Sequence, residues 1–348
     1  MNETTMAEFK ATARVWEQAS LDAAPARARV AVVIPCHRAR QHVMKVIAAI
    51  PEVVSRIYVV DDRCPDETGR HVEAINADPR VSVLYNEVNL GVGGAVMAGY
   101  ARALEDGCDI IVKMDGDDQM DARALPRLIG PIVRGDADYT KGNRFYDLTQ
   151  IKRMPRLRIF GNAMLSFMTK ISSGYWDIFD PTNGYTAIHA RVVSQLPLSK
   201  ISRRYFFETD MLFRLNIVRA VVVDVPMDAR YGDETSNLRI SRILFDFLFK
   251  HLRNTGKRIF YNYFLRDLSL ASIQLALGTL FISVGTVLGL RFWYDSFATG
   301  ITASAGTVML AALQIIIGIQ LLLGFLAYDI AAVPRRTLHP LLSSADGD

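Results

Sequence analysis

Two long uncharged apolar segments near the C-terminus constrain this chain most strongly. Leu268–Leu290 carries no charged residue over 23 positions, and Ile301–Tyr328 is a second segment of this kind. At about 1.5 Å per residue the first would form a helix of roughly 34 Å, which is enough to cross the hydrocarbon core of a bilayer. We therefore expect residues 267–329 to form two transmembrane helices.

The charges around these segments predict their orientation. Arg239–Arg266 contains seven Lys or Arg against one acid, and Arg335 and Arg336 follow the second segment. The connecting loop, expected at Arg291–Gly300, has one Arg and one Asp. Because loops rich in Lys and Arg stay on the cytoplasmic side, we expect both termini, including the 330–348 tail, and the large N-terminal part in the cytoplasm.

Residues 239–266 have the composition of basic amphipathic juxtamembrane helices. Ile243–Phe249 is apolar almost all round, and Ile259–Phe264 carries aromatic residues close to Lys257, Arg258 and Arg266. Aromatic and basic side chains together suit a helix that lies in the plane of an anionic leaflet. The alternative is a helix that packs on a soluble domain.

The N-terminus, the cysteines and the net charge limit the compartment and the partners. Residues 1–28 are polar, with at most a short amphipathic helix around 7–19, and we expect no signal peptide there. Cys36, Cys64 and Cys108 lie far apart, without a Cys-x-x-Cys motif. They predict buried free thiols in a reducing compartment, not disulfides or a zinc site. A net charge of +4 over 348 residues gives no indication of a nucleic-acid partner.

Residues 29–238 have the pattern of one α/β domain. Unbroken apolar runs predict strands, and segments of helical periodicity lie between them. In the first half we expect strands at 29–35, 57–60, 81–85 and 110–114, with helices at 42–50, 68–76 and 95–105. In the second half we expect helices at 124–134, 159–171 and 207–216, with strands at 139–145, 185–189 and 221–225. This alternation predicts an α/β fold with a Rossmann-like mixed, mostly parallel sheet and helices on both faces.

Polar residues collect where the first four strands end. Pro35, Asp61–Asp62, Asn89–Gly94 and Asp115–Asp118 all lie at or just after the end of an apolar run. In parallel sheets, ligands bind beyond the carboxyl ends of the strands, so we expect these residues to share one site. Asp61 and Asp62 can accept hydrogen bonds from a base or a ribose, or cap the helix that follows.

Asp115 and Asp117 are the candidate metal ligands. They belong to a stretch in which four carboxylates fall within seven positions. A bound cation usually relieves the repulsion between carboxylates this close together. Both aspartates can reach one divalent ion that also binds a substrate phosphate. The alternative is an acidic turn facing solvent, with Asp121 capping the next helix.

The glycines of Asn89–Gly94 allow a different interpretation. Gly91 and Gly93 follow a strand and precede a helix, which is half of a dinucleotide-binding fingerprint. However, Val96 occupies the third glycine position, the segment follows the third strand and no Walker lysine is present. An oxidoreductase is therefore not favoured. A close approach of the backbone to a diphosphate and a simple tight turn both stay open.

Six motifs in this order resemble family 2 glycosyltransferases of the GT-A fold. They are VVIPCHRA, VVDDRCPDET, NLGVGGAVMAGY, KMDGDDQ, DPTNGY and RYFFETDMLFRL. With its C-terminal apolar segments the chain is similar to the polyprenyl-phosphate group, which includes dolichyl-phosphate mannose synthases and bacterial bactoprenol glucosyltransferases. Some members have four spans where this chain has two. It also lacks the Gln-x-x-Arg-Trp motif of processive enzymes, which favours transfer of a single sugar.

The resemblance implies roles for individual residues. Asp115-Gly116-Asp117 would hold Mg²⁺ or Mn²⁺ on the nucleotide diphosphate, with Gln119 assisting. Catalytic candidates are Asp117, Glu208 and Asp210. The donor would contact Pro35, Asp61, Asp62, Asn89, Gly91, Gly93, Asp115, Asp117, Asp180 and Asn183. Arg144, Arg156 and Arg158 would bind the acceptor phosphate.

The chemistry of the transfer agrees with these roles. A nucleoside diphosphate gains negative charge as it leaves, and a divalent ion stabilises that charge. A phosphate monoester has a second pKa of about 6, so it is already ionised and nucleophilic at neutral pH. A cationic clamp is then needed more than a general base. Glu208 and Asp210 have a structural alternative, namely a pair of acids stabilised at a helix N-terminus.

The leading hypothesis is an inverting, metal-dependent hexosyltransferase of the bacterial inner membrane. It would move one sugar from a nucleotide-sugar donor to a polyprenyl phosphate of the undecaprenyl or dolichyl type. The alternatives are transfer to another lipid such as diacylglycerol, and a non-catalytic membrane scaffold that binds nucleotide. The sugar, the nucleobase, the lipid length and the oligomeric state stay open, because the two spans can pack with each other or with a neighbouring subunit.

Overall fold

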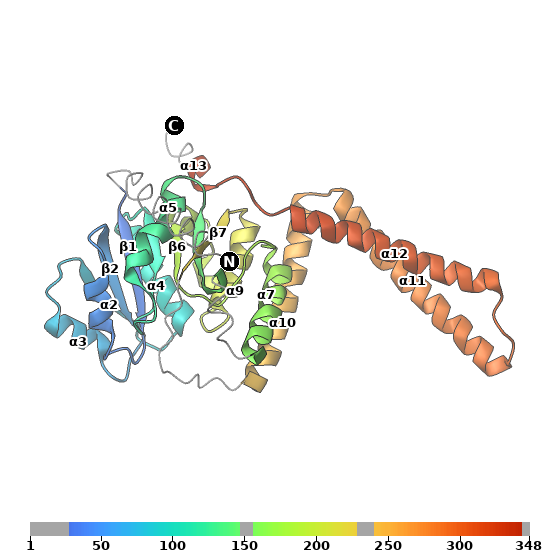
Figure 1. Ribbon diagram of the computed structural model, residues 1–348, viewed down its shortest axis with the longest axis horizontal. Helices are drawn as coiled ribbons and strands as arrows, with labels where there is room; N and C mark the ends of the chain where they lie inside the picture. Colours follow the sequence, from blue (N-terminus) through green and yellow to red (C-terminus); the bar gives the residue numbers. More distant parts are fainter. Residues whose placement is uncertain (1–27, 147–155, 228–239, 343–348) are drawn as a thin grey trace, which may run out of the picture. The chain divides into compact units, whose positions relative to one another are not determined.

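Seven strands form one sheet in the computed structural model (Figure 1). The structure describes residues 28–146, 156–227 and 240–342, apart from the side chains of 156–158 and 240–244. The strand order is β3-β2-β1-β4-β6-β5-β7. Four parallel strands form its first part: β1 (Val30–Cys36), β2 (Val54–Asp61), β3 (Val81–Tyr85) and β4 (Ile110–Lys113). The predicted mostly parallel sheet is confirmed. The short helix expected at 7–19 lies outside the described residues.

The strand β6 (Thr186–His189) reverses the direction of the chain within the sheet. It pairs antiparallel with β4 and with β5 (Tyr139–Asn143), and β5 pairs in parallel with β7 (Val222–Pro226). Thr186 is therefore the register partner of both Lys113 and Lys141. As a result, the first residue of β6 lies at the same edge as the carboxyl ends of β1, β2 and β4.

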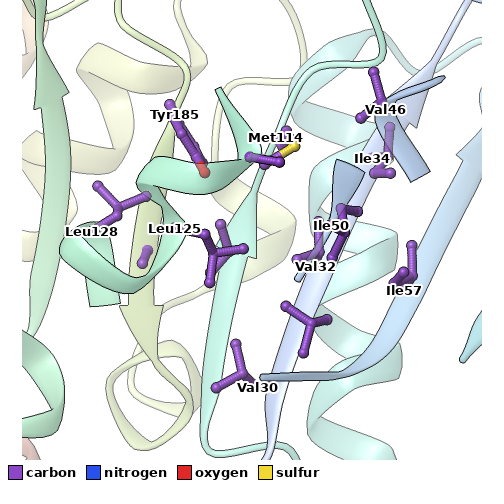
Figure 2. Close-up of a cluster of buried hydrophobic side chains, with 14 of the residues drawn as sticks. Val30, Val32, Ile34, Val46, Ile50, Ile57, Met114, Leu125, Leu128 and Tyr185 are labelled. Carbon is purple, nitrogen blue, oxygen red and sulfur yellow. The ribbon is translucent and has the colours of Figure 1, made fainter. Parts of the chain in front are cut away.

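Helices cover both faces of the sheet, as expected. On one face, side chains of α2 (Val43–Ala49), α3 (Thr68–Ile75) and α5 (Leu125–Val133) join those of the strands in a single apolar core. Figure 2 shows Val32 and Ile34 of β1 in this core, with Leu125 and Leu128 of α5. The other face carries α4 (Val92–Glu105). A Cβ at Gly99 would lie 2.3 Å from Val33 Cγ1, so helix and strand come this close only because residue 99 is glycine.

The second half of the sheet-containing part also carries α7 (Arg156–Ser173), α8 (Ala190–Ser194) and α9 (Phe207–Ile217). The helices expected at 159–171 and 207–216 are confirmed. The three cysteines are free and buried, also as expected.

The described part of the chain contains two compact units. The first comprises residues up to Asn254 together with those from Pro334 onward, and the second comprises Thr255–Val333. In the first unit, α13 (His339–Leu342) and the residue before it are held by Asp138, whose fully buried carboxylate accepts hydrogen bonds from the backbone N–H groups of Leu338 and His339. The expected domain boundary at 238/239 lies outside the described residues and stays a prediction.

The second unit contains two helices that are long and apolar enough to cross a membrane, judged by length and composition: α11 (Leu270–Thr299) and α12 (Ala305–Ala331). The helix α10 (Ile240–Phe260) and a π-helical turn (Tyr261–Arg266) precede them. The expectation of a loop at Arg291–Gly300 was wrong. Residues 291–299 contain no Gly or Pro, so α11 continues to Thr299 and ends where Gly300 takes φ +71°.

Candidate active site

A cavity of about 660 Å³ opens at the carboxyl ends of β1, β2 and β4. Its walls come from these strand ends, from the turn before α4 and from the segment that leads into α9. The lining residues are Pro35, Cys36, His37, Arg38, Ala39, His42, Asp62, Asn89, Gly91, Val92, Ala95, Lys113, Asp115, Gly116, Asp117, Arg204, Tyr205 and Glu208. The cavity thus brings together seven of the residues that the sequence singled out: Pro35, Asp62, Asn89, Gly91, Asp115, Asp117 and Glu208.

The two aspartates after β4 both reach this cavity. Asp115 Oδ1 lies 2.8 Å from Lys113 Nζ, and Asp117 Oδ1 accepts a hydrogen bond of 3.1 Å from the backbone N–H of Gln119. The side chain of Gln119 is not part of the lining. The turn is held from outside by an ion pair between Lys45 and Asp118, a residue with φ +62°.

The carboxylate oxygens of Asp115 and Asp117 are suitable ligands for a divalent metal that is bound together with a substrate phosphate. In the described residues, no group of three or more His, Cys, Asp or Glu could hold a metal by itself. Mg²⁺ in nucleotide sites is usually bound by one or two carboxylates plus phosphate oxygens, not by a cage of protein ligands alone. Two neighbouring carboxylates on a cavity wall therefore suit a metal that arrives with a diphosphate.

A buried lysine connects the Asp115 carboxylate with Glu208. The side chain of Lys113 is 1% exposed, and its Nζ also lies 3.5 Å from Glu208 Oε1. Burial favours the neutral amine, but Asp115 and Glu208 outweigh it and raise the pKa of Lys113. Burial also raises the pKa of Glu208, and the charge of Lys113 opposes this shift.

Gly184 provides the space for this lysine. A Cβ at residue 184 would lie 2.1 Å from Lys113 Nζ and 2.9 Å from Asp115 Oδ2. Gly184 therefore affects the cavity by leaving room for Lys113. The Asp180–Gly184 segment itself contributes no lining residue to the cavity.

Asp62 organises the turn before α4. Its carboxylate accepts hydrogen bonds from the backbone N–H groups of Leu90 (2.8 Å) and Gly91 (2.7 Å). The Asn89 Nδ2 atom lies 3.2 Å from His37 Nδ1 across the cavity rim. Gly91 has φ +80°, which favours glycine.

The N-terminus of α4 is occupied by the protein itself. Gly93 N and Gly94 N both donate to the carbonyl oxygen of Arg203, at 2.9 and 3.2 Å. Gly93 belongs to the first turn of α4, and a Cβ there would lie 2.4 Å from the backbone oxygen of Ser202. A contact between Gly93 and the donor stays a prediction. Gly93 is not among the lining residues.

Asp61 and Asp62 have different partners. Asp61 is buried and accepts 2.7 Å hydrogen bonds from Cys64 N and Gly69 N, so it caps the turn into α3, which was the structural alternative for this pair. It does not line the cavity. A contact between Asp61 and the donor stays a prediction.

Arg144 and Asp180 lie together, away from this lining. Arg144 donates from Nε and Nη2 to the two carboxylate oxygens of Asp180, both at 2.8 Å. Burial alone would raise the pKa of Asp180, but hydrogen bonding and charge from Arg144 lower it. Asn183 is also buried and accepts from Tyr185 N at 3.0 Å. A smaller cavity of about 270 Å³ lies nearby in the chain, lined by Asn143, Phe145, Ile159, Ala163 and Phe179.

The remaining sequence candidates are distributed as follows. Asp210 is 1% exposed and does not line the cavity; its partners are Ser202, Arg214 and Asn254. Arg156 and Arg158 belong to the first turn of α7, and their side chains lie outside the described residues.

Comparisons with known proteins show the family of this chain. Residues 31–196 match the family model described as Glycosyl transferase family 2. An undecaprenyl-phosphate mannosyltransferase from Micrococcus luteus is 32% identical over 203 residues, which covers 57% of this chain and 82% of that protein. The chain belongs to glycosyltransferase family 2.

Two further similarities extend the comparison of this glycosyltransferase. A UDP-N-acetylglucosamine–dolichyl-phosphate N-acetylglucosaminyltransferase from Methanococcus voltae is 25% identical over 216 residues, covering 58% of this chain and 86% of that protein. Glucosyl-3-phosphoglycerate synthase from Mycobacterium tuberculosis, solved in complex with UDP, superposes with a TM-score of 0.53 at 19% identity, covering 68% of this chain and 83% of that chain. The structural likeness shows the expected GT-A fold.

Sequence reasoning missed several lining residues of this glycosyltransferase. They are the charged and aromatic side chains His37, Arg38, His42, Lys113, Arg204 and Tyr205. Lys113 had a detectable signal, because it is the one charged residue in the apolar run 110–114. Arg38 and Arg204 lie in segments without periodicity, where the sequence does not indicate which side chains face a cavity.

Proposed function

We propose that this glycosyltransferase is an inverting, metal-dependent enzyme that moves one hexose from a nucleotide sugar to a polyprenyl phosphate at the cytoplasmic leaflet. The observation that carries the proposal is the pair Asp115 and Asp117 on the wall of the 660 Å³ cavity. The names of the two relatives support the acceptor, since one is an undecaprenyl-phosphate and the other a dolichyl-phosphate transferase. The two long apolar helices agree with a lipid acceptor.

The donor would lie along the ends of β1, β2 and β4. Its nucleoside would contact Pro35, Asp62 and Asn89, and its diphosphate would approach Asp115 and Asp117. These two carboxylates would hold Mg²⁺ or Mn²⁺, with Gln119 assisting. When bound, the metal neutralises the charge that develops on the leaving diphosphate. Lys113 would keep Asp115 oriented through the 2.8 Å ion pair.

The transfer itself needs few protein groups. An oxygen of the acceptor phosphate would attack the anomeric carbon from the face opposite to the diphosphate. The new C–O bond forms as the sugar–diphosphate bond breaks, and the nucleoside diphosphate leaves with the bonding electrons. Since a phosphate monoester is largely ionised at neutral pH, no proton has to be removed. Arg144, already oriented by Asp180, would bind the acceptor phosphate together with Arg156 and Arg158.

Exposed apolar faces support contact with a membrane. On α10, Phe245, Phe249 and Leu252 are exposed at helical spacing, and on α7, Phe160 and Phe167 are exposed. Apolar side chains on one helix face with basic residues beside them suit the interface of an anionic leaflet. The excess of Lys and Arg in 239–266 supports a cytoplasmic position for this part of the chain.

The test is a transfer assay with the full chain in nanodiscs. A panel of UDP- and GDP-sugars is combined with a short polyprenyl phosphate, with Mn²⁺, with Mg²⁺ and with EDTA. Sugar transfer to the polyprenyl phosphate that requires metal and disappears in the Asp115→Ala, Asp117→Ala double variant supports the proposal.

Three outcomes contradict it. Full activity of the double variant in EDTA would exclude the metal site. Transfer to diacylglycerol alone favours the other lipid acceptor, whose hydroxyl needs a base. Nucleotide binding without transfer to any lipid favours the scaffold.

A further inference from the structure

We propose that Asp210 is a positioning residue that fixes the wall of the donor cavity to helix α10. The inference rests on the proposed function, in which the cavity binds the nucleotide sugar. One carboxylate oxygen of Asp210 contacts the wall segment, and the other contacts α10. Oδ2 accepts a hydrogen bond of 2.9 Å from Ser202 N, and Oδ1 accepts one of 3.0 Å from Asn254 Nδ2 on α10. Asp210 and Asn254 are each 1% exposed, so water does not compete for these bonds.

A ring contact next to Asp210 strengthens the same connection. The Phe206 ring lies 5.4 Å from the ring of Phe247 and 5.0 Å from that of His251, both edge-to-face. Lys250 Nζ lies 5.7 Å from the same ring. Phe247, Lys250, His251 and Asn254 recur along α10 at the spacings of three and four residues that place side chains on one helix face. That face of α10 therefore packs on residues 202–210.

The same segment forms part of the cavity wall. Arg204 and Tyr205, which line the cavity, lie between Ser202 and Phe206, the two residues attached to Asp210 and α10. On the other side, the Arg203 carbonyl accepts from Gly93 N and Gly94 N at the start of α4. The wall segment is thus held between α4 and α10, and Asp210 provides the polar attachment to α10.

This geometry assigns Asp210 a different role from Glu208. Glu208 lines the cavity and contacts Lys113, whereas both oxygens of Asp210 accept hydrogen bonds from protein donors, including Arg214 Nε at 3.2 Å. A base must present an oxygen to the acceptor, but a positioning residue need not touch the substrate. Loss of Asp210 should therefore weaken binding of the nucleotide-sugar donor. The carboxylate should also work at position 254 when an amide stands at position 210.

A swap of the two side chains tests this role. In Asp210→Asn, Asn254→Asp, the amide at position 210 keeps an oxygen for Ser202 N and gains a donor for the carboxylate at position 254. Asn254→Asp alone places two carboxylates face to face without a donor between them. The variants Asp210→Ala, Asn254→Ala, Asn254→Asp and the swap are prepared as full chains in nanodiscs. Asp136→Asn serves as control for an Asp-to-Asn change, since Asp136 is exposed and forms a surface ion pair with Arg134.

The readouts are the Kd for UDP and for GDP in Mn²⁺ by calorimetry, and kcat and KM with the donor found in the transfer assay. Asp210→Ala, Asn254→Ala and Asn254→Asp should raise Kd and donor KM about tenfold, the effect of roughly one buried hydrogen bond. The swap should return Kd to within about threefold of wild type. Thermal unfolding identifies any variant that fails to fold. If Asp210→Ala fails to fold, the affinities of Asn254→Ala and of the swap still test the role of Asp210.

Two results would overturn the inference. The first is wild-type nucleotide affinity in the three disrupting variants. The second is a loss of kcat in the swap by a hundredfold or more with unchanged Kd, which is the behaviour of a lost base. If wild-type protein transfers no sugar to polyprenyl phosphate, the proposed function fails, but the Kd series still tests Asp210 separately.

Discussion

The ammonium group of Lys113 lies 2.8 Å from the carboxylate of Asp115. The lysine side chain is only 1% exposed. The same ammonium lies 3.5 Å from Glu208 at the start of α9. One lysine thus balances two carboxylates, one at the end of β4 and one on α9. The lysine also joins the side of the cavity that carries Asp115 and Asp117 to the side formed by residues 204–208.

Replacing Lys113 should be costly for stability. In Lys113→Met, Asp115 and Glu208 lose their shared cation, and an uncompensated buried charge typically costs about 3–5 kcal/mol. We expect the free energy of unfolding to fall by about this amount in denaturant titrations of the full chain. Adding Glu208→Gln should recover a clear part of the loss, because it removes one of the two unpaired charges. The exposed Lys200→Met is the control; no recovery in the double variant would indicate lost packing instead of lost charge.

Gly184→Ala should impair function and stability together. The new Cβ would lie 2.1 Å from Lys113 Nζ, and the end of a lysine side chain can move aside more easily than backbone can. That movement breaks the ion pair with Asp115. We expect donor KM to rise and kcat/KM to fall at least about tenfold. The unfolding temperature should also fall, because a buried ion pair is disturbed. Gly306→Ala, where the nearest atom is 3.9 Å away, should keep wild-type activity, and equal kinetics of the two variants would contradict the role of Gly184.

The fold was largely predictable because its strands are local features. β1 is an unbroken apolar run and β4 is apolar up to Lys113, and their length and β-branched residues distinguish them from helices. The reversed strand β6 was not predictable in the same way. Its place between β4 and β5 depends on contacts such as Lys113 opposite Thr186, which are distant in sequence and leave no local signal.

The site was predictable to the extent that strand ends determine it. Asp115 and Asp117 follow β4 directly, so the register of the strand alone brings them to the cavity. Asp61 and Asp62 have the same chemistry and are neighbours, but only Asp62 lines the cavity. The difference arises because Asp61 turns toward the N–H groups of Cys64 and Gly69, a choice that depends on the three-dimensional turn.

Acidic pH should weaken the packing of α10. Burial lowers the pKa of His251 from its ordinary value of 6.5 to about 4. Between these values the unfolded chain binds a proton that the folded chain does not, so stability falls as the pH falls from 6.5 toward 4. We expect a contribution on the order of 2–3 kcal/mol from this residue.

The measurement is chemical denaturation at pH 7 and pH 4.5 of wild type and His251→Gln. The variant should lose less stability on acidification than wild type, since it lacks the group that titrates. Other acid-sensitive groups, such as His189, whose pKa burial also lowers to about 4, are present in both proteins and cancel in the comparison. The same acid-induced loss in both proteins would contradict the assignment to His251.

The pair of apolar helices should depend on two glycines. A Cβ at Gly318 of α12 would lie 2.9 Å from the backbone oxygen of Gly278 on α11, and one at Gly278 would lie 3.0 Å from Gly318 O. Backbone atoms cannot move aside as side-chain ends do, so Gly318→Ala should force the helices apart. Since close packing of small residues drives helix association in lipid, we expect a lower unfolding temperature in nanodiscs. Gly289→Ala, where the nearest atom is Ala311 Cβ at 3.8 Å, should behave as wild type. If both alanine variants unfold at the wild-type temperature, the contact between Gly278 and Gly318 does not hold the two helices together.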